Sequence, residues 1–320
     1  MDLKSQNNID LSIIIPVYNE TDNIKPVVSS IKEDLDKSGL CYEVLFIDDG
    51  SHDGTFSTIQ KIHTKDHRFK AVQLKNNFGK SEAYMVGFEM ASGDLVATMD
   101  GDLQDDPADL FKLIDEVRKG VDLVIGWKKT GKSSIVPFYL SKLFNFAIRI
   151  LTKSTLHDLN CPLRVMTRDV AKNLDIYASL HRYIPILAAS QGCTVNEVVV
   201  SNKKRLHGSS RYGYFKYFES FFDIMTVLFV TYYRKRPLQF LGPIGLISLI
   251  IGIWIDAYYF FLGMLGIDKM RNNIPSLLLG LTLIMIGMQI ILSGLIGEMI
   301  SRELRKEKKQ YESMIKQRLV

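Results

Sequence analysis

Two apolar segments near the C-terminus place the strongest constraint on how this 320-residue chain can fold. They cover residues 238–265 and 274–300, and each exceeds the roughly 20 residues that a helix needs to cross a bilayer. Four strongly polar residues interrupt them, namely Gln239, Asp256, Gln289 and Glu298. A core helix of a soluble protein is usually apolar on one face, whereas these segments are apolar on all sides. The sequence therefore predicts two transmembrane helices in preference to two buried core helices.

Basic residues gather at the outer ends of the two predicted spans. Arg234, Lys235 and Arg236 precede the first span, Arg302, Arg305, Lys306, Lys308 and Lys309 follow the second, and the loop between them contains Lys269 and Arg271. Because cytoplasmic flanks carry the excess of Lys and Arg, this distribution predicts that both termini lie in the cytosol. Residues 1–10 are polar, so we expect no signal peptide. The prediction is a multi-pass protein of the cytoplasmic (inner) cell membrane.

The formal net charge of +5 fits membrane flanks and an anionic ligand. No nucleic-acid-binding module is recognisable, and we expect no nucleic-acid partner. The three cysteines, Cys41, Cys161 and Cys193, lack the spacing of a metal or redox site, and we expect reduced thiols.

Ahead of the spans, apolar runs alternate with helix-like segments. Strands are predicted at residues 11–17, 42–47, 69–74, 94–99, 121–126 and 195–200, and helices at residues 22–39, 79–91 and 107–119. Such alternation predicts an α/β fold with a mostly parallel sheet and helices on both faces. Ligands of these sheets bind beyond the carboxyl ends of the strands. Acidic and glycine-rich clusters follow several of the predicted strands, so we expect one binding site at that edge.

One cluster, Asp100-Gly101-Asp102-Leu103-Gln104-Asp105-Asp106, follows the predicted strand 94–99. Carboxylates this close repel one another unless a cation lies among them. Oxygen ligands of this kind suit Mg2+ or Mn2+, which leave coordination positions for phosphate oxygens. Gly101 allows a turn through which Asp100 and Asp102 could address one ion. An acidic turn that caps the following helix is the alternative, and it applies best to Asp105 and Asp106.

Four motifs, taken in order, resemble those of the family 2 glycosyltransferases. They are Ile13-Ile14-Ile15-Pro16-Val17-Tyr18-Asn19-Glu20, Asp48-Asp49-Gly50-Ser51, Asn77-Phe78-Gly79-Lys80 and Asp100-Gly101-Asp102-Leu103-Gln104-Asp105. With the paired spans, the set most closely resembles enzymes that transfer sugars to polyprenyl phosphates, such as dolichyl-phosphate mannose synthase and the bactoprenol glucosyltransferases. The resemblance extends from about residue 11 to the second span. It implies a glycosyltransferase A type (Rossmann-like) sheet and a divalent metal on the Asp-x-Asp motif.

The resemblance also implies roles for the matched residues. The implied nucleotide-sugar-binding residues are Pro16, Tyr18, Glu20, Asp48, Asp49, Asp100 and Gly101. Asp100, Asp102 and Gln104 would hold Mg2+ or Mn2+ against the donor diphosphate. Asp102 and Asp158 are the implied catalytic carboxylates, with Asp158 on the acceptor side. An ordinary Asp-Gly turn is the alternative for Asp48 and Asp49, and a helix cap or salt bridge is the alternative for Asp158.

Cationic residues further along the chain are expected to bind phosphate of the donor or the acceptor. They are Lys128, Arg164, Arg205 and Arg211. Arginine supplies a planar donor fork for phosphate, and Lys128 stands where relatives often carry Arg. Solvated juxtamembrane charge is the alternative for residues 203–211, and we favour it for Lys203 and Lys204. Relatives usually carry Ser-Gly-Phe before the position of Arg164, whereas this chain carries Cys161-Pro162-Leu163. The different residues affect the expected conformation of this loop.

The predicted organisation has four parts. Residues 1–208 are predicted to form a cytosolic nucleotide-sugar-binding catalytic domain with an interfacial helix at about 135–152. Residues 209–236 are predicted to form a juxtamembrane interfacial helix, and residues 237–300 contain the two spans. Residues 301–320 are predicted to form a charged cytosolic tail of helical pattern. Packing against the catalytic domain is the alternative for the helix at 135–152. Asp256 is either a functional carboxylate or a residue that reaches water at the far interface. Glycines in the second span, Gly280, Gly287, Gly294 and Gly297, would allow close helix packing and leave a homo-oligomer open.

The expected function is an inverting transfer of a hexose from a nucleotide-sugar to polyprenyl phosphate, at the cytosolic face of the membrane and in contact with membrane lipid. Glucose from UDP-glucose is preferred because the paired C-terminal spans resemble those of the bactoprenol enzymes, and mannose from GDP-mannose comes second. The alternatives are a family 2 enzyme with another membrane acceptor, a nucleotidyltransferase and a non-catalytic membrane scaffold.

Overall fold

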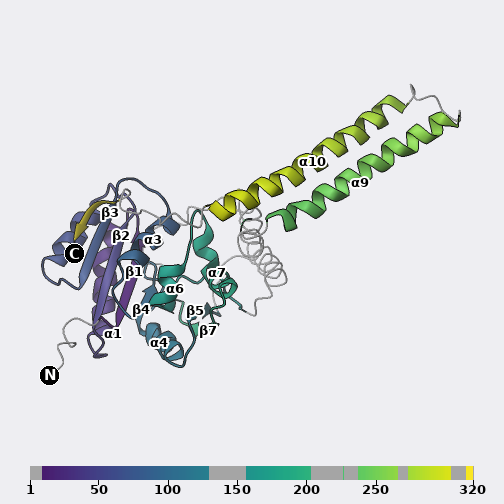
Figure 1. The fold of residues 1–320 in the computed structure, drawn as a ribbon. Helices are drawn as coiled ribbons and strands as arrows, with labels where there is room; N and C mark the ends of the chain where they lie inside the picture. The colour runs from purple at the N-terminus through teal and green to yellow at the C-terminus, as the bar shows by residue number, and fades with distance from the viewer. Residues whose placement is uncertain are drawn as a thin grey trace. The chain divides into compact units, whose positions relative to one another are not determined.

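A computed structural model of the chain describes residues 9–129, 156–202, 226, 237–265, 273–303 and 315–319. The chain divides into two compact units (Figure 1): a sheet unit of Met1–Val227 with Gln310–Val320, and a hairpin unit of Leu228–Lys309. The interfacial helix predicted at about 135–152 lies outside the described residues, as do Arg205, Arg211 and the helix predicted at 209–236 apart from residue 226.

The described residues of the sheet unit form one mixed sheet of eight strands. In chain order the strands are β1 (Leu11–Val17), β2 (Tyr42–Asp48), β3 (Phe69–Leu74), β4 (Leu95–Thr98), β5 (Leu123–Lys128), β6 (Arg164–Thr167), β7 (Val195–Val200) and β8 (Ile315–Leu319). Their order across the sheet is β7-β5-β6-β4-β1-β2-β3-β8. The pairs β1–β2, β1–β4, β2–β3 and β5–β7 are parallel, whereas β6 and β8 run antiparallel to their neighbours. The predicted mostly parallel sheet is confirmed.

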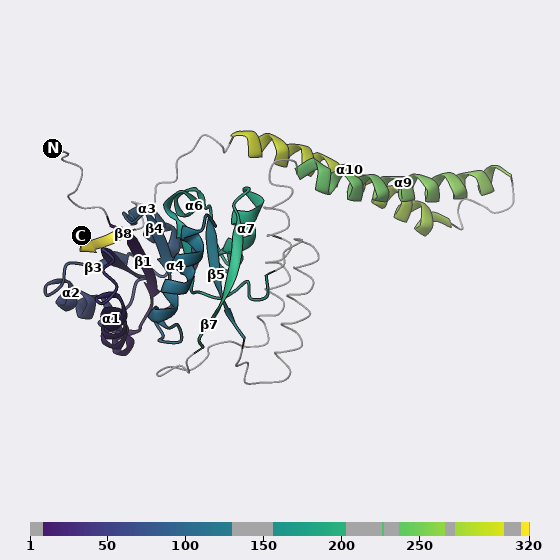
Figure 2. The ribbon, with the colours of Figure 1, turned by 90° about the horizontal axis from the view of Figure 1, so that it is seen from below.

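Helices cover both faces of this sheet (Figure 2). They are α1 (Thr21–Leu35), α2 (Thr55–His63), α3 (Lys80–Met90), η1 (Pro107–Asp109), α4 (Leu110–Arg118), α6 (Arg168–Asn173), η2 (Leu180–Tyr183) and α7 (Ile184–Ser190). One layer contains α1 packed against α2 and η1, and the other contains α3 packed against α6 and η2. Strand β1 is buried along its length apart from Pro16, as expected for a parallel strand covered on both faces.

Two strands were absent from the sequence prediction. Strand β6 follows the loop of Cys161-Pro162-Leu163 and lies between β4 and β5, antiparallel to both. Strand β8 pairs with β3 at the edge of the sheet, so the helical pattern predicted for the tail is wrong at residues 315–319. A row of open N–H and C=O groups on an edge strand favours such pairing over a solvated helix.

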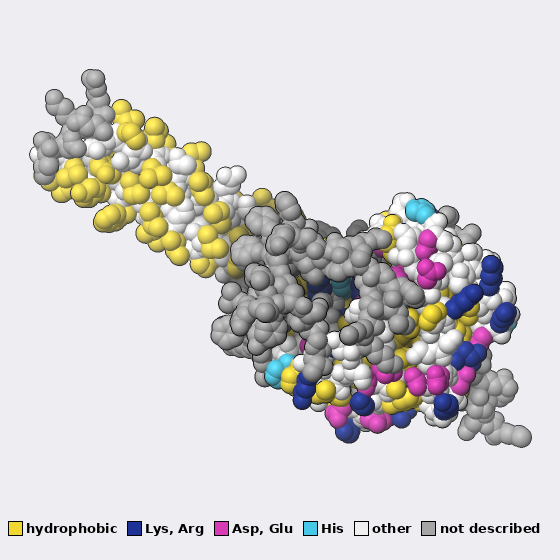
Figure 3. All heavy atoms as spheres, turned by 180° about the vertical axis from the view of Figure 1, so that it is seen from behind, with side chains coloured by type: hydrophobic (Ala, Val, Ile, Leu, Met, Phe, Trp, Pro, Cys, Tyr) yellow, Lys and Arg dark blue, Asp and Glu magenta, His cyan; other side chains and the backbone are white. Residues whose placement is uncertain are grey.

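The hairpin unit consists of α9 (Pro237–Met264) and α10 (Ile274–Glu303). Both helices are long and apolar enough to cross a membrane, and only 11% and 17% of their most apolar windows are buried, unlike the core helix of a soluble protein. Hydrophobic side chains cover their visible surface, whereas Lys, Arg, Asp and Glu side chains gather on the sheet unit (Figure 3).

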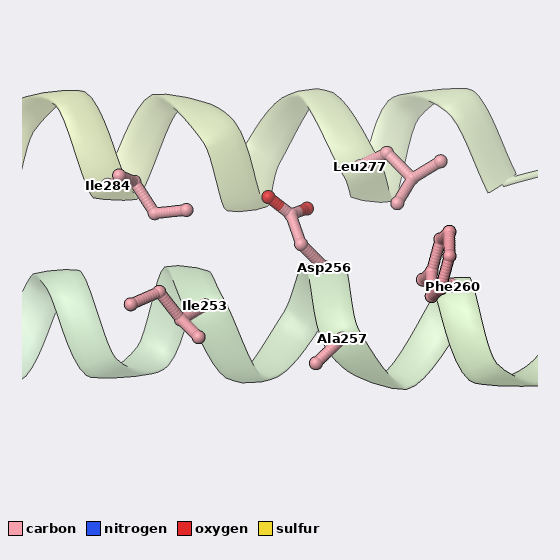
Figure 4. A pocket seen from close by; sticks show the side chains of 6 residues that line it. All are labelled: Ile253, Asp256, Ala257, Phe260, Leu277 and Ile284. Atoms are coloured by element: carbon pink, nitrogen blue, oxygen red, sulfur yellow. The ribbon is translucent and has the colours of Figure 1, made fainter.

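Glycines lie at the contact between α9 and α10. A Cβ atom on Gly245 would lie 2.7 Å from the carbonyl oxygen of Gly287, and one on Gly252 would lie 2.6 Å from that of Gly280. Small residues let membrane helices approach this closely. Close helix packing was predicted for four glycines, and two of them, Gly280 and Gly287, pack against α9 of the same chain. The carboxylate of Asp256 points from α9 toward α10 at Gly280 (Figure 4).

Candidate active site

The loops after β1 and β2 are tied together at the carboxyl edge of the sheet. The backbone N–H of Asn19 donates to Ser51 Oγ at 2.8 Å, and the N–H of His52 donates back to Asn19 Oδ1 at 3.0 Å. Asn19 adopts a φ of 54°, a left-handed conformation that Asn tolerates better than most residues. Three residues predicted to border the nucleotide, Pro16, Tyr18 and Glu20, are half-buried in or beside the first loop.

Asp48 and Asp49 brace the loops of this edge. The carboxylate of Asp48 accepts hydrogen bonds from the Ser51 N–H and from Gln73 Nε2, both at 3.0 Å, and Asp48 is fully buried. The carboxylate of Asp49 accepts from the N–H groups of Phe78 and Gly79 at 2.8 and 2.9 Å. Burial raises the pKa of Asp49, and these two donors oppose the rise. Both carboxylates therefore position the loops after β2 and β3.

The Asp-x-Asp motif forms a turn directly after β4. Asp102 Oδ1 accepts from the N–H of Gln104 at 3.2 Å, and Leu103 has a φ of 65°, a conformation that is strained for a branched side chain. Gly101 is buried against β1, and a Cβ atom there would lie 3.1 Å from Val17 Cγ1. Asp100, Asp102 and Gln104 remain half-buried, so their polar groups sit at the surface of this edge.

Two lysines from different elements neutralise the acidic turn. Lys80 Nζ, in the first turn of α3, lies 2.5 Å from Asp100 Oδ1, and Lys128 Nζ, at the end of β5, lies 2.7 Å from Asp105 Oδ1. Burial raises the pKa of Asp100, but Lys80, Lys128 and Arg164 together bring it below the ordinary value. Burial raises the pKa of Asp105 above its ordinary value, although Lys128 opposes the rise.

Arg164, which pairs in register with Thr98 at the end of β4, is held by a network on α3 and η2. Its Nη1 donates to the backbone oxygen of His181 at 3.0 Å, and the residue is 2% exposed. Ser81 Oγ donates to the Ala178 carbonyl at 2.6 Å and lies 3.0 Å from His181 Nδ1. Burial lowers the pKa of His181 to about 3, and Lys80, Arg182 and Arg164 act in the same direction. His181 is therefore neutral near pH 7, and the positive charge of Arg164 helps to lower the pKa of Asp100.

The loop that carries Asp158 packs against the ends of β4 and β5. Thr98 Oγ1 donates to the Pro162 carbonyl at 2.6 Å, and the Gly126 N–H donates to the Leu163 carbonyl at 2.9 Å. Asp158 Oδ1 accepts from the Asn160 N–H at 3.3 Å in a local turn. The Cys161 thiol, whose pKa burial raises to about 12, is also influenced by the charges of Asp105, Lys128 and Asp158. This side of the site thus adjoins the Asp-x-Asp turn.

The residues of the turn fit a hard divalent cation. Asp100 and Asp102 flank one glycine and present carboxylate oxygens, and the turn already holds a cation, the ammonium of Lys80. Among the described residues no group of three or more His, Cys, Asp and Glu side chains could hold a metal ion. Mg2+ suits a set of one or two carboxylates completed by water and substrate phosphates, so two carboxylates with Gln104 meet its needs.

Among the described residues, the structure brings most of the predicted site residues to one edge of the sheet, including Arg164, which begins β6 beside the end of β4. Asp106 caps η1 through the Ala108 N–H at 3.2 Å, which confirms the capping alternative for this residue, whereas Asp105 forms the buried ion pair with Lys128. Sequence reasoning missed the pairing of Lys80 with Asp100 and the role of Ser81 and His181 in supporting Arg164. The motif Asn77–Lys80 carried a signal for Lys80, because it places a lysine just beyond the carboxyl end of a strand.

Comparisons with known proteins extend this description. Residues 12–175 match the family model described as glycosyl transferase family 2. The chain is 32% identical over 308 residues to the dodecaprenyl-phosphate galacturonate synthase of Rhizobium johnstonii, covering 92% of this chain and 88% of that protein. It is 31% identical over 301 residues to the undecaprenyl-phosphate 4-deoxy-4-formamido-L-arabinose transferase of Aeromonas hydrophila, covering 92% and 90%.

A solved structure shares the fold. It is the glucosyl-3-phosphoglycerate synthase from Mycobacterium tuberculosis in complex with Mn2+, UDP and glucosyl-3-phosphoglycerate, with a TM-score of 0.54 and 19% identity. The match covers 69% of this chain and 79% of that one. At this identity the likeness shows the fold alone, and it agrees with the glycosyltransferase A type predicted from the motifs.

Proposed function

Because this chain belongs to glycosyltransferase family 2, we propose that it transfers a sugar from a nucleotide-sugar donor to polyprenyl phosphate. The observation that carries this proposal is the similarity to two polyprenyl-phosphate transferases over 92% of the chain. The matched region is longer than the sheet unit, so the similarity also includes the hairpin unit. A soluble acceptor would give no reason for two candidate membrane spans of 28 and 27 residues on the same chain.

The donor end of the proposed reaction uses the turn after β4. Asp100, Asp102 and Gln104 would hold Mg2+ or Mn2+, and the bound ion would supply positive charge for the departing nucleotide diphosphate. Arg164 is buried and its positive charge acts on Asp100 of the same turn, where low solvent access strengthens its effect. The bond between the sugar's anomeric carbon and the diphosphate oxygen breaks, and its electron pair leaves with the nucleotide diphosphate.

The acceptor end uses a phosphate that needs little activation. The second pKa of a phosphomonoester is about 6, so the attacking oxygen is largely ionised near neutral pH. That oxygen forms the new bond to the anomeric carbon from the opposite side, which inverts the configuration. The protein's contribution is positioning. We assign to Asp158 the orientation of the acceptor, and to Arg205 and Arg211, outside the described residues, contacts with its phosphate.

In this proposal, anchoring in the membrane would give the protein access to its lipid acceptor. Both helices of the hairpin would span the cytoplasmic membrane with the sheet unit and both termini in the cytosol, as the basic flanks predict. The lipid chain of the acceptor would then remain in the bilayer while its phosphate reaches the cytosolic surface.

The sugar is the finer part of the proposal. We retain glucose from UDP-glucose as one candidate, with mannose from GDP-mannose behind it. The names of the two relatives add galacturonate and 4-deoxy-4-formamido-L-arabinose as candidates. One is an acidic sugar and the other an amide-bearing pentose, so a donor panel must include both kinds.

The test is transfer of radiolabelled sugar to polyprenyl phosphate by the full-length protein in detergent. Donors are UDP-glucose, GDP-mannose, UDP-galacturonate and UDP-4-deoxy-4-formamido-L-arabinose, each with Mn2+ and with chelator. We expect labelled lipid with one donor, lost on chelation and reduced at least about 100-fold in Asp102→Asn, the scale for removing one electrostatic stabiliser. Lys112→Gln is the matched control, because Lys112 pairs with Asp109 outside the turn.

Two results would refute parts of the proposal. Transfer from every donor only to a soluble acceptor would exclude polyprenyl phosphate. Release of pyrophosphate from a nucleoside triphosphate, without glycosyl transfer, would move the chain to a nucleotidyltransferase activity.

A further inference from the structure

Lys80 occupies the same carboxylate that the proposed function assigns to a metal ion. Its Nζ lies 2.5 Å from Asp100 Oδ1. The side chain of Lys80 is 33% exposed and that of Asp100 is 27% exposed, so the pair is open to solvent on one side. The turn therefore already contains a cation on one of its two carboxylates.

The backbone around Lys80 is fixed more firmly than its side chain. The carboxylate of Asp49 accepts from the N–H groups of Phe78 and Gly79, directly ahead of Lys80, at 2.8 and 2.9 Å. Gly79 has a φ of 106°, which favours glycine, and is the N-cap of α3. From this anchored first turn the flexible side chain extends past the ring of Tyr84, with Nζ 5.7 Å from the ring centroid. The ammonium can move while its Cα stays in place.

A divalent ion and the ammonium of Lys80 compete for Asp100. Mg2+ binds carboxylate oxygens at about 2.0–2.1 Å, and an ammonium on the same oxygen would lie close enough to repel it strongly. Lys128 differs, because its partner Asp105 is 3% exposed and is engaged by the Asp100 N–H at 3.1 Å. Lys128 can keep its partner when an ion enters the turn, whereas Lys80 cannot.

We propose that Lys80 is the exchangeable counter-cation of Asp100: the divalent ion displaces it, and the released ammonium then binds the phosphates of the nucleotide. This inference rests on the metal-binding role of Asp100 in the proposed function. The nucleotide diphosphate arrives with the metal and supplies the negative charge that Asp100 no longer offers. Lysine suits such a double role, because its ammonium is a compact charge on a flexible stem.

The exchange predicts effects of opposite sign on two ligands. Without Lys80, Mn2+ alone should bind more tightly, because no ammonium has to leave Asp100. UDP in the presence of saturating Mn2+ should bind more weakly, because a phosphate partner is missing. A permanent structural ion pair predicts a different outcome, since its loss would disturb the turn and weaken the binding of both ligands.

The experiment measures both affinities on the full-length protein in detergent. Free Mn2+ is followed by electron paramagnetic resonance without nucleotide, and UDP binding by calorimetry at saturating Mn2+. For Lys80→Gln we expect Mn2+ affinity to rise about threefold to fivefold, the scale of a partly exposed ion pair. UDP affinity should fall about tenfold, the scale of a hydrogen bond to a charged group. Lys80→Arg keeps the charge and should leave Mn2+ affinity near that of the wild type.

Controls separate this inference from the proposed function. Lys112→Gln removes an ammonium 2.6 Å from Asp109, a residue outside the metal set, and should change neither affinity. Unchanged or weaker Mn2+ binding in Lys80→Gln would overturn the exchange, and unchanged UDP binding would overturn the phosphate contact. If Asp100→Asn leaves Mn2+ binding intact, the ion does not sit on Asp100 and the exchange is refuted. Transfer of labelled sugar would still decide the proposed function independently.

Discussion

Replacement of Lys128 by Met should destabilise the sheet unit strongly. Lys128 Nζ lies 2.7 Å from Asp105 Oδ1, and the Asp105 side chain is 0% exposed while that of Lys128 is 14% exposed. Asp105 Oδ2 accepts from the Asp100 N–H at 3.1 Å. The substitution would leave a buried carboxylate with one backbone donor and no cation in contact. Lys128 would then stabilise the fold in addition to making the phosphate contact that the sequence predicts.

The expected magnitude follows from this burial. Removing one partner of a buried ion pair costs about 3–5 kcal/mol, because the remaining charge is uncompensated. In a domain of 150–250 residues each kcal/mol shifts the melting temperature by about 2–4 °C, so we expect a drop of roughly 10 °C. The double variant Lys128→Met/Asp105→Asn removes the charge together with its partner and should recover most of that loss. Lys128→Arg should stay close to the wild type.

The assay is thermal unfolding of the full-length protein in detergent at pH 7.5, followed by circular dichroism, with transfer activity measured in parallel. Unfolding of Lys128→Met within about 2 °C of the wild type would refute the structural reasoning, because it lies below the shift expected from 1 kcal/mol. Loss of transfer at unchanged stability would instead assign Lys128 to phosphate binding alone.

Three further predictions concern other parts of the molecule. His181 has a pKa of about 3 in the folded protein against an ordinary 6.5, so the unfolded chain binds more protons between these pH values. The free energy of unfolding should therefore fall by about 1.4 kcal/mol for each pH unit below about pH 6.5. In a pH series of melting curves, the stability of His181→Asn should depend less steeply on pH than that of the wild type. Gly280→Ala should separate α9 from α10 and cost about 1–3 kcal/mol, whereas Gly242→Ala, whose Cβ would lie 3.7 Å from Leu238 Cδ1, should melt like the wild type in the same detergent. Deletion of residues 315–319 should expose the edge of β3 and increase aggregation measured by light scattering, and an unchanged signal would contradict the pairing of β3 with β8.

The strands that carry the motifs could be predicted from the sequence because their signals are local. An apolar run followed by Asp and Gly marks the end of β2, and a similar run followed by Asp100 and Gly101 marks the end of β4. Strand β6 has only four residues, and β8 has Lys, Gln and Arg between its terminal Ile and Leu, so neither gives a periodic signal. Their strand conformation depends on pairing with strands that are distant in the sequence.

The acidic turn illustrates where local reasoning ends. Asp105 and Asp106 are adjacent and chemically identical, yet one forms a buried ion pair with Lys128 and the other caps η1. The cap depends on an N–H two residues away and is readable from the sequence, whereas the ion pair depends on the position of β5 in the sheet. The same reason hid the contact of Lys80 with Asp100, which joins α3 to the end of β4.

The position of β8 has a consequence for the order in which the protein can be made. Among the strands of the described residues, β1 to β7 precede α9 in the chain, and β8 follows α10. During synthesis the edge of β3 therefore stays open until both apolar helices have been translated, and domains that await a late segment are prone to mispairing. Strand β8 can therefore pair with β3 only after both apolar helices have been translated, so completion of the sheet unit follows synthesis of the hairpin unit.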